Sequence, residues 1–246
     1  MSVTAATAPS APAGPRRPNR RRTRRHRVLL GVVALLSLGV VGYAAVVYFG
    51  FDPSTSQVGL REEVPWHYPV LMAHITTAAV ALAVGPLQFS RRIRAHRRVH
   101  RWIGRTYLFA GVLPSALVGV PAALLSTGGP VAAAGLLVGD VAWGVTAVVA
   151  YRAARQRRYR DHARWMTRNF ALTFAAVTFR IWLPLLILAQ LPILGTVHRG
   201  DFDALFAAAY AITCWLAFLP NLFAVMTFQR RSRRSTAALG RAAAAA

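Results

Sequence analysis

Lysine is absent from this chain of 246 residues, and cysteine occurs once, as Cys214. Without lysine there is no Schiff-base amine, no pyridoxal phosphate anchor and no P-loop lysine, so those enzyme classes are excluded. A single cysteine excludes an intrachain disulfide, a cysteine-ligated iron–sulfur cluster and a zinc site built from several cysteines. Any chemistry must therefore come from arginine, histidine and the other polar residues.

Acidic residues are also scarce. The 30 basic residues, all of them arginine, stand against 7 Asp and Glu residues, which gives a formal net charge of +23. Charged residues make up 15% of the chain and hydrophobic residues 55%, whereas a soluble domain of this size carries about 25% charged residues. This composition predicts a membrane protein.

Six long apolar segments account for the composition. They cover residues 28–51, 69–90, 106–126, 131–151, 169–191 and 204–228. Each is long enough for a spanning helix, which needs about 20 residues, and none alternates polar and apolar residues as a barrel strand does. The sequence therefore predicts an all-α fold, a polytopic bundle of six transmembrane helices within residues 28–229.

Arginine is concentrated at alternate connections between these segments. All but Arg61, Arg180 and Arg199 lie in the tail 1–27, in the connections 91–105 and 152–168, or in the tail 230–246. The positive-inside rule then predicts that both termini are cytoplasmic and that the protein lies in the plasma or inner membrane. The Arg/Pro-rich tail 1–27 cannot bury a core and is predicted to be disordered, and 230–246 is predicted to be a second cytoplasmic tail.

The same placement decides which partners the arginines have. Basic residues confined to alternate connections indicate topology and contact with anionic lipids on the cytoplasmic face, each contributing roughly 1 kcal/mol near the surface. Nucleic acid is therefore not an expected partner. The first segment is too long for a signal peptide and no cleavage site follows it, so it is interpreted as an uncleaved anchor.

Two charged residues, Asp140 and Arg180, lie inside the apolar segments. Counted from the segment ends, both lie near the middle of the membrane, on consecutive antiparallel helices. An unpaired charge at that depth costs about 3 kcal/mol or more. We therefore expect Asp140 and Arg180 to form an ion pair, either as a structural lock or as part of a proton relay or anion site.

Polar side chains recur at helical spacing on three of the segments. They are His74 and Gln88 on the second, Asn169 and Thr173 on the fifth, and Tyr210 and Asn221 on the sixth. Such faces either pack helices closely together or line a polar path through the bundle. Two alternative functions follow. The protein is either a small transporter or permease with a polar path at the midplane, or an accessory membrane protein that catalyses no reaction.

Histidine is found near both membrane surfaces. His67, His74 and His198 lie toward the outer side, and His100 and His162 lie at similar depth on the inner side. A b-type haem requires two imidazoles from facing helices at one depth. The inner pair His100 and His162, or an outer pair of His74 with His67 or His198, would make the protein a haem-b electron-transfer protein with a quinone or another redox partner. The alternative for each histidine is an ordinary hydrogen-bonding role.

Other catalytic or metal-binding patterns are weak. His96 and His100 have metal-ligand spacing, but no carboxylate is close to them in sequence, so no metal site is predicted. The sequence contains no HExxH motif and no Ser/His/Asp spacing typical of a triad. Whether the protein is an enzyme therefore depends on a cofactor.

Five short stretches of sequence, together with Arg180, carry a family resemblance. They are HITTA at residues 74–78 with GPLQF at 85–89, HRWIGRTY at 100–107, and RWMTRNFALT at 164–173, followed by Arg180 and PNL at 220–222. Over roughly residues 70 to 228 the chain resembles the uncharacterised membrane-protein family called domain of unknown function 2306. The resemblance implies a bacterial-type multi-pass membrane protein but no reaction. It singles out His74, Gln88, His100, His162, Arg180 and Asn221 as candidate site residues.

Overall fold

The computed structural model describes residues 20–244, so the predicted tail up to residue 19 lies outside the described residues. Within this range every regular element is a helix and no strand is present. The predicted all-α fold is therefore confirmed.

The regular elements occur in the following order along the chain. They are α1 (Arg20–Tyr48), η1 (Pro53–Thr55), α2 (His67–Val84), η2 (Gly85–Phe89), α3 (Arg91–Ala95), α4 (Arg97–Arg105), the π-helix η3 (Thr106–Val112), α5 (Leu113–Leu124), α6 (Gly129–Arg155), α7 (Tyr159–Thr173), α8 (Ala175–Gln190), η4 (Leu191–Ile193), α9 (Phe202–Leu216) and α10 (Leu219–Ala244).

Six helical stretches of the described chain are long and apolar enough to cross a membrane. They are Arg24–Tyr48, His67–Phe89, Arg97–Leu124, Gly129–Arg155, Tyr159–Ile193 and Phe202–Ser235. Each overlaps one of the six predicted segments, which confirms the six-helix architecture. Four of them join consecutive helical elements. The last one bends at Ala217–Phe218, just before Pro220, which lacks the N–H that a continuous helix would require.

The helices extend further into the arginine runs than the sequence analysis predicted. α1 begins at Arg20, so residues 20–27 are helical and not disordered as predicted, and α10 continues to Ala244, so the predicted tail from residue 230 is helical up to that point. Arginine and alanine are both strong helix formers, and an arginine side chain can lie along the helix while its guanidinium stays in water. Apolar composition therefore marks the part of the helix within the bilayer and not the helix ends.

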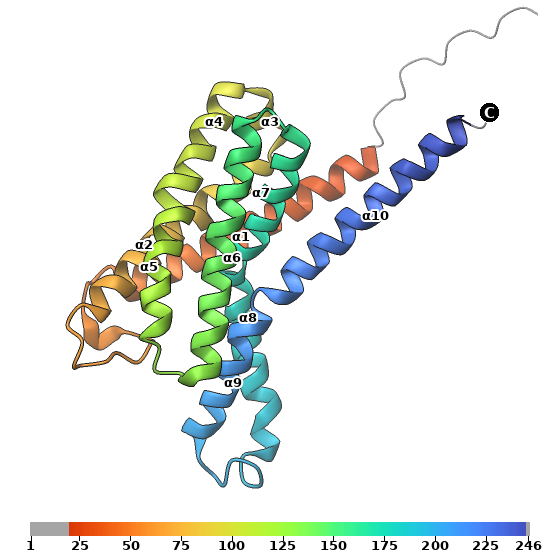
Figure 1. Cartoon of the computed structure of the whole chain (residues 1–246). Helices are drawn as coiled ribbons and strands as arrows, with labels where there is room; N and C mark the ends of the chain where they lie inside the picture. The colour runs from red at the N-terminus through yellow and green to blue at the C-terminus, as the bar shows by residue number, and fades with distance from the viewer. Residues whose placement is uncertain (1–19, 245–246) are drawn as a thin grey trace, which may run out of the picture.

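The arginine-rich parts of the chain gather at one end of the bundle (Figure 1). α3, α4 and the start of α7 lie at that end, and α1 and α10 both extend toward it. The opposite, arginine-poor end carries the connection after α1 and the connection between α8 and α9. α1 crosses the other helices obliquely and packs mainly on α2.

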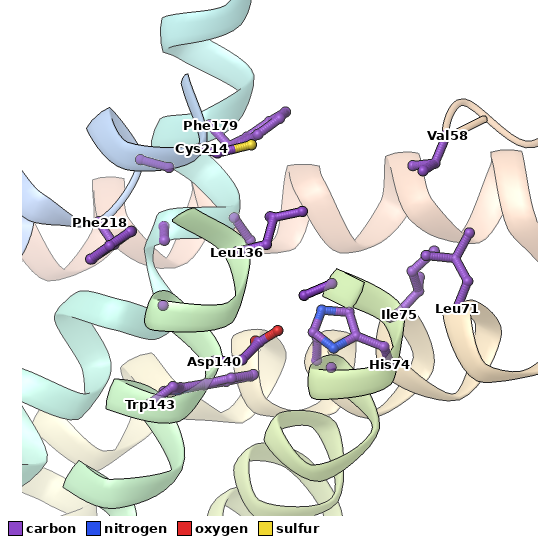
Figure 2. Close-up of a pocket in the computed structure, with 18 of the residues that line it drawn as sticks. Val58, Leu71, His74, Ile75, Leu136, Asp140, Trp143, Phe179, Cys214 and Phe218 are labelled. Carbon is purple, nitrogen blue, oxygen red and sulfur yellow. The ribbon is translucent and has the colours of Figure 1, made fainter. Parts of the chain in front are cut away.

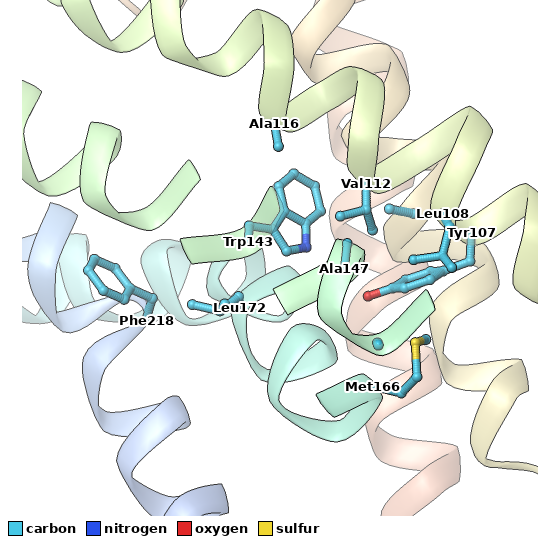
Figure 3. Packing of buried hydrophobic residues seen from close by; sticks show 11 residues of the cluster. Tyr107, Leu108, Val112, Ala116, Trp143, Ala147, Met166, Leu172 and Phe218 are labelled. Carbon is cyan, nitrogen blue, oxygen red and sulfur yellow. The ribbon is translucent and has the colours of Figure 1, made fainter. Parts of the chain in front are cut away.

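The core lies on α6, which contacts α5, α7 and α9 (Figure 3). Trp143 and Ala147 of α6 pack against Tyr107 and Val112 of η3, and all four are buried. Small residues allow the helices to approach closely, as is common in membrane bundles. At Gly111 of η3, an added Cβ would lie 2.9 Å from the Cα of Ala81 on α2.

Candidate functional site

A cavity of about 310 Å³ lies between α1, α2, α5, α6, α8 and α9 (Figure 2). It extends from Val58, in the connection after α1, to Trp143 in the middle of α6. Most of the lining is apolar. The polar and titratable residues of the lining are Tyr48, His67, His74, Ser126, Asp140, Thr173, Arg180, Tyr210 and Cys214. The cavity thus contains several of the side chains that the sequence singled out.

His74 is held in the cavity wall by α5. Its Nδ1 lies 3.0 Å from the carbonyl oxygen of Ser115, and because a carbonyl only accepts, Nδ1 is the donor. The Ser115 hydroxyl in turn donates to the carbonyl oxygen of His74 at 3.0 Å. The neutral imidazole therefore keeps Nε2 as a free acceptor.

The side chains of Asp140 on α6 and His74 on α2 both lie next to Gly119 of α5. A Cβ added to Gly119 would lie 2.7 Å from Cγ of Asp140 and 2.8 Å from Nδ1 of His74. Both side chains therefore use space that any other residue at position 119 would fill. Among the described residues no hydrogen bond or ion pair involves the Asp140 carboxyl group, and Figure 2 shows it directed toward the cavity.

Arg180 of α8 also lines the cavity but faces a different neighbour. Its guanidinium lies over the ring of Tyr43 on α1, 5.3 Å from the ring centroid, and Nη1 donates to the carbonyl of Ala176 at 2.8 Å. The predicted ion pair with Asp140 is wrong, because the ion pairs of the described residues include neither side chain. Equal depth did not place the two on facing sides, since Asp140 points to α2 and α5 whereas Arg180 points to α1.

The outer histidines do not fit a haem. His67 lines the cavity, but its Nδ1 accepts the backbone N–H of Arg61 at 3.0 Å, which leaves the ring hydrogen on Nε2 when the imidazole is neutral. His67 and His74 also belong to one helix, whereas axial ligands must approach a haem from opposite faces. His198 is bonded through Nε2 to Oε1 of Gln190 at 3.1 Å and lies outside the cavity lining.

The inner histidines lie near the arginine-rich end. Nδ1 of His162 donates to the carbonyl of Ala150 at 2.9 Å. Gln88 is buried against Gly104 of α4, one turn after His100. Among the described residues neither Nε2 of Gln88 nor Nδ1 of His100 has a hydrogen-bond partner. None of these three side chains lines the cavity.

A closed ring of hydrogen bonds lies at the cavity wall, because Trp143 and Thr173 belong to both. The indole N–H of Trp143 donates to Oγ1 of Thr173 at 2.9 Å, and this hydroxyl lies 2.6 Å from that of Tyr107. The Tyr107 hydroxyl donates to Oδ1 of Asn169 at 2.6 Å, and Nδ2 of Asn169 donates to the carbonyl of Trp143 at 2.8 Å. All four side chains are buried. The ring joins η3, α6 and α7 and ends the cavity on the arginine-rich side.

The side chain of Asn221 on α10 makes hydrogen bonds that have a structural role. Its Nδ2 lies 3.0 Å from Oγ1 of Thr178 and 2.9 Å from the carbonyl of Ala217. These contacts tie α10 to α8 at the bend before Pro220, and Asn221 does not line the cavity.

The sequence profile of the family described as "Predicted membrane protein (DUF2306)" matches residues 71–228, well over half of the chain. The chain belongs to this family. No curated protein and no solved structure matched it. The resemblance stated from the sequence is therefore confirmed, and it covers the cavity residues from Leu71 onward but not α1.

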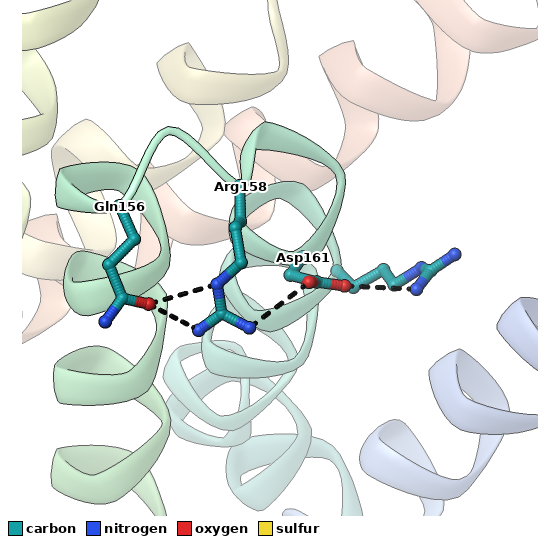
Figure 4. Close-up of polar contacts among 4 residues, drawn as sticks. Gln156, Arg158 and Asp161 are labelled. Carbon is teal, nitrogen blue, oxygen red and sulfur yellow. Dashed lines mark hydrogen bonds and ion pairs between the residues drawn. The ribbon is translucent and has the colours of Figure 1, made fainter.

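In this DUF2306 protein, acidic residues are nearly absent from the arginine-rich end. Asp161 is paired there with Arg158 at 3.6 Å and with Arg164 at 3.2 Å (Figure 4). Arg158 also donates to Oε1 of Gln156 through Nε and Nη2, at 3.0 and 2.6 Å. These partly exposed contacts fix the turn between α6 and α7 and lie away from the cavity. No group of three or more His, Cys, Asp or Glu in residues 20–244 could hold a metal ion.

Sequence reasoning missed three residues that position the site. Ser115 and Gly119 hold and make room for His74 and Asp140, and Tyr107 closes the ring with Asn169 and Thr173. Ser115 could have been found as a hydroxyl inside an otherwise apolar segment. Gly119 carries no such signal, because glycine is common wherever membrane helices pack.

Proposed function

We propose that this DUF2306 membrane protein is a permease-type protein that binds a small, mainly apolar solute with a polar group in the cavity. The observation that carries the proposal is the cavity lining itself. A largely apolar wall with a few convergent polar groups is typical of a small-molecule site. Here those groups are His74 and Asp140 at one edge of the cavity and Arg180 at the other edge, and they come from three different helices.

The two charged residues inside the spanning helices support the proposal that the cavity binds a solute. A charged side chain at mid-membrane depth costs about 3 kcal/mol or more on insertion scales, and such residues usually mark substrate pathways. Asp140 and Arg180 do not neutralise each other, so each needs water, a proton or a solute group as its partner. A purely structural role would instead favour the direct pair that the described residues lack.

The shape of the cavity supports a permease over a static binder. It reaches the arginine-poor end at Val58 and His67, while on the other side Trp143 and Thr173 belong to the closed ring. A cavity that extends toward one end of the bundle and stops at a packed layer on the other side is compatible with alternating access. We infer that the arginine-rich end is cytoplasmic, with anionic lipids bound there, and that the cavity faces the outside of the plasma or inner membrane.

Cys214 offers a direct test because it lines the cavity and is the only cysteine. In protein reconstituted in nanodiscs at alkaline pH, methyl methanethiosulfonate is expected to modify the buried Cys214 slowly, because the reagent must enter the cavity and only the thiolate attacks it. Leu136→Trp fills the cavity and should slow the reaction at least about tenfold. The rate is measured by intact-protein mass spectrometry.

The matched control is Val138→Trp, which places the same side chain on the exposed, lipid-facing side of α6. It should leave the rate unchanged, and Cys214→Ser should abolish the modification. Equal rates in wild type and Leu136→Trp would show that the cavity does not admit the reagent, and the proposed binding site would then be wrong.

A haem at the inner pair is a second candidate function. It is favoured by His162, whose Nδ1 donates to a backbone carbonyl and whose Nε2 is therefore free, which is the usual arrangement of a ligating histidine. Electron transfer to a quinone or another redox partner would follow. We expect an absorption spectrum of purified, haem-supplemented protein to show a Soret band that His162→Ala removes. A colourless preparation would contradict this candidate and leave the cavity proposal intact.

A further inference from the structure

Arg180 lies at the seam between α8 and α1, at the edge of the cavity. Tyr43 of α1 covers one face of its guanidinium, and one N–H group donates to a carbonyl of its own helix. No carboxylate of the described residues pairs with it. Most of the guanidinium donors are therefore available to a group that enters from the cavity or from the seam.

Of the helices that line the cavity, α1 is poorly buried in the bundle. Only 11% of its most apolar 18-residue part is buried, compared with 44% for the corresponding part of Arg97–Leu124. Even so, it contributes Val40, Val41, Ala44 and Tyr48 to the lining. α1 also lies outside the family match, which begins at residue 71. The cavity is thus separated from the surrounding lipid by a helix that has little other contact with the bundle.

We propose that the solute is a membrane-dissolved alkyl carboxylic acid, which passes α1 from the bilayer and is held by its carboxylate on Arg180. This inference rests on the proposed function of the cavity. The mainly apolar lining requires a mainly apolar molecule, and the planar guanidinium donates in the fork geometry that matches a carboxylate. His74 and Asp140 lie at the other polar edge, around Gly119, and do not occupy Arg180.

The depth of Arg180 selects a carboxylic acid over a phospholipid. The phosphate of a phospholipid is permanently charged and stays in the headgroup region. A carboxylic acid has a neutral form, which partitions into hydrocarbon far more easily than an ion does. In the cavity the acid passes its proton to a base, for which His74 offers its free Nε2, and the carboxylate is stabilised by an arginine that stays protonated at every relevant pH.

The test uses two photoreactive probes, a hexadecanoic acid and a hexadecanol that carry the same diazirine in the chain. Each is added to the full-length protein in nanodiscs of phosphatidylcholine, and the adducts are mapped by peptide mass spectrometry. We expect the acid to label cavity residues of α1 and α8 and the alcohol to label them weakly. Arg180→Gln should reduce labelling by the acid about tenfold, which a lost charge-assisted pair would explain.

Two further variants make the result specific. Arg199→Gln removes an arginine from the connection after α8 and should leave labelling unchanged, and Arg180→Lys should restore part of it. If the acid and the alcohol label the cavity equally, or Arg180→Gln has no effect, the acidic head group is refuted while the cavity remains a binding site. If neither probe labels the cavity although methyl methanethiosulfonate reaches Cys214, the ligand class and the lateral path are refuted and the proposed function still stands.

Discussion

Gly111→Ala is expected to lower the free energy of unfolding by about 2 kcal/mol, because it adds a methyl group where two helices touch. The new Cβ would lie 2.8 Å from Cβ of Ala81 and 2.9 Å from its Cα and N. Two of these atoms are backbone, so relief requires α2 and η3 to move apart. The measurement is unfolding of the purified protein in mixed micelles, followed by tryptophan fluorescence.

The control for this prediction is Gly42→Ala on α1. Its added Cβ meets nothing within 4 Å, and alanine in a helix is more favourable than glycine by about 1 kcal/mol. Gly42→Ala should therefore be neutral or slightly stabilising. If both variants unfold at the same denaturant concentration, the close contact of α2 with η3 does not contribute to stability as proposed here.

The six spans could be predicted from composition because a spanning helix has a length and polarity fixed by the bilayer. The helix ends could not, since Arg20 and Ala244 are as compatible with a helix in water as with an irregular tail. The arginine distribution predicted which connections share one end of the bundle, and the structure places those connections together (Figure 1).

The sequence predicted which residues belong to the site, but not how their side chains are arranged relative to one another. His74, Asp140 and Arg180 were recognisable from the sequence because polar groups are rare in apolar segments, and all three line the cavity. Depth along a helix follows from counting residues, whereas the direction that a side chain faces depends on helix rotation and tilt. The direct pairing of Asp140 with Arg180 assumed a rotation that the packing of α1 and α5 does not give.

Asn169 and Thr173 are a second case in which the sequence could not predict the direction of side chains. Their spacing of four residues predicted a shared helix face, but not the partners of that face. The partners come from the π-helix η3 and from α6, through Tyr107 and Trp143. Neither a π-helix nor the direction of an indole N–H could be read from the sequence, because both depend on how the neighbouring helices pack.

The hydrogen-bond ring has a consistent direction. The indole N–H of Trp143 donates to Thr173, and Tyr107 donates to Oδ1 of Asn169. The Thr173 hydroxyl shares its one proton between the Tyr107 hydroxyl at 2.6 Å and the backbone carbonyl of Asn169 at 3.1 Å. The amide of Asn169 returns to the carbonyl of Trp143, so each hydroxyl both accepts and donates. In such a network, removal of one member leaves buried polar groups without partners.

Thr173→Ala is therefore expected to destabilise the protein by about 2 kcal/mol, because the indole N–H of Trp143 loses its acceptor and Tyr107 loses its donor. The matched control is Thr167→Ala on the same helix, where an exposed hydroxyl bonds only to the carbonyl of Ala163. That change should cost nothing measurable. Both are measured by unfolding in mixed micelles. Equal stability of the two variants would mean that the ring is not what holds η3, α6 and α7 together, and the closed inner end of the cavity would then need another cause.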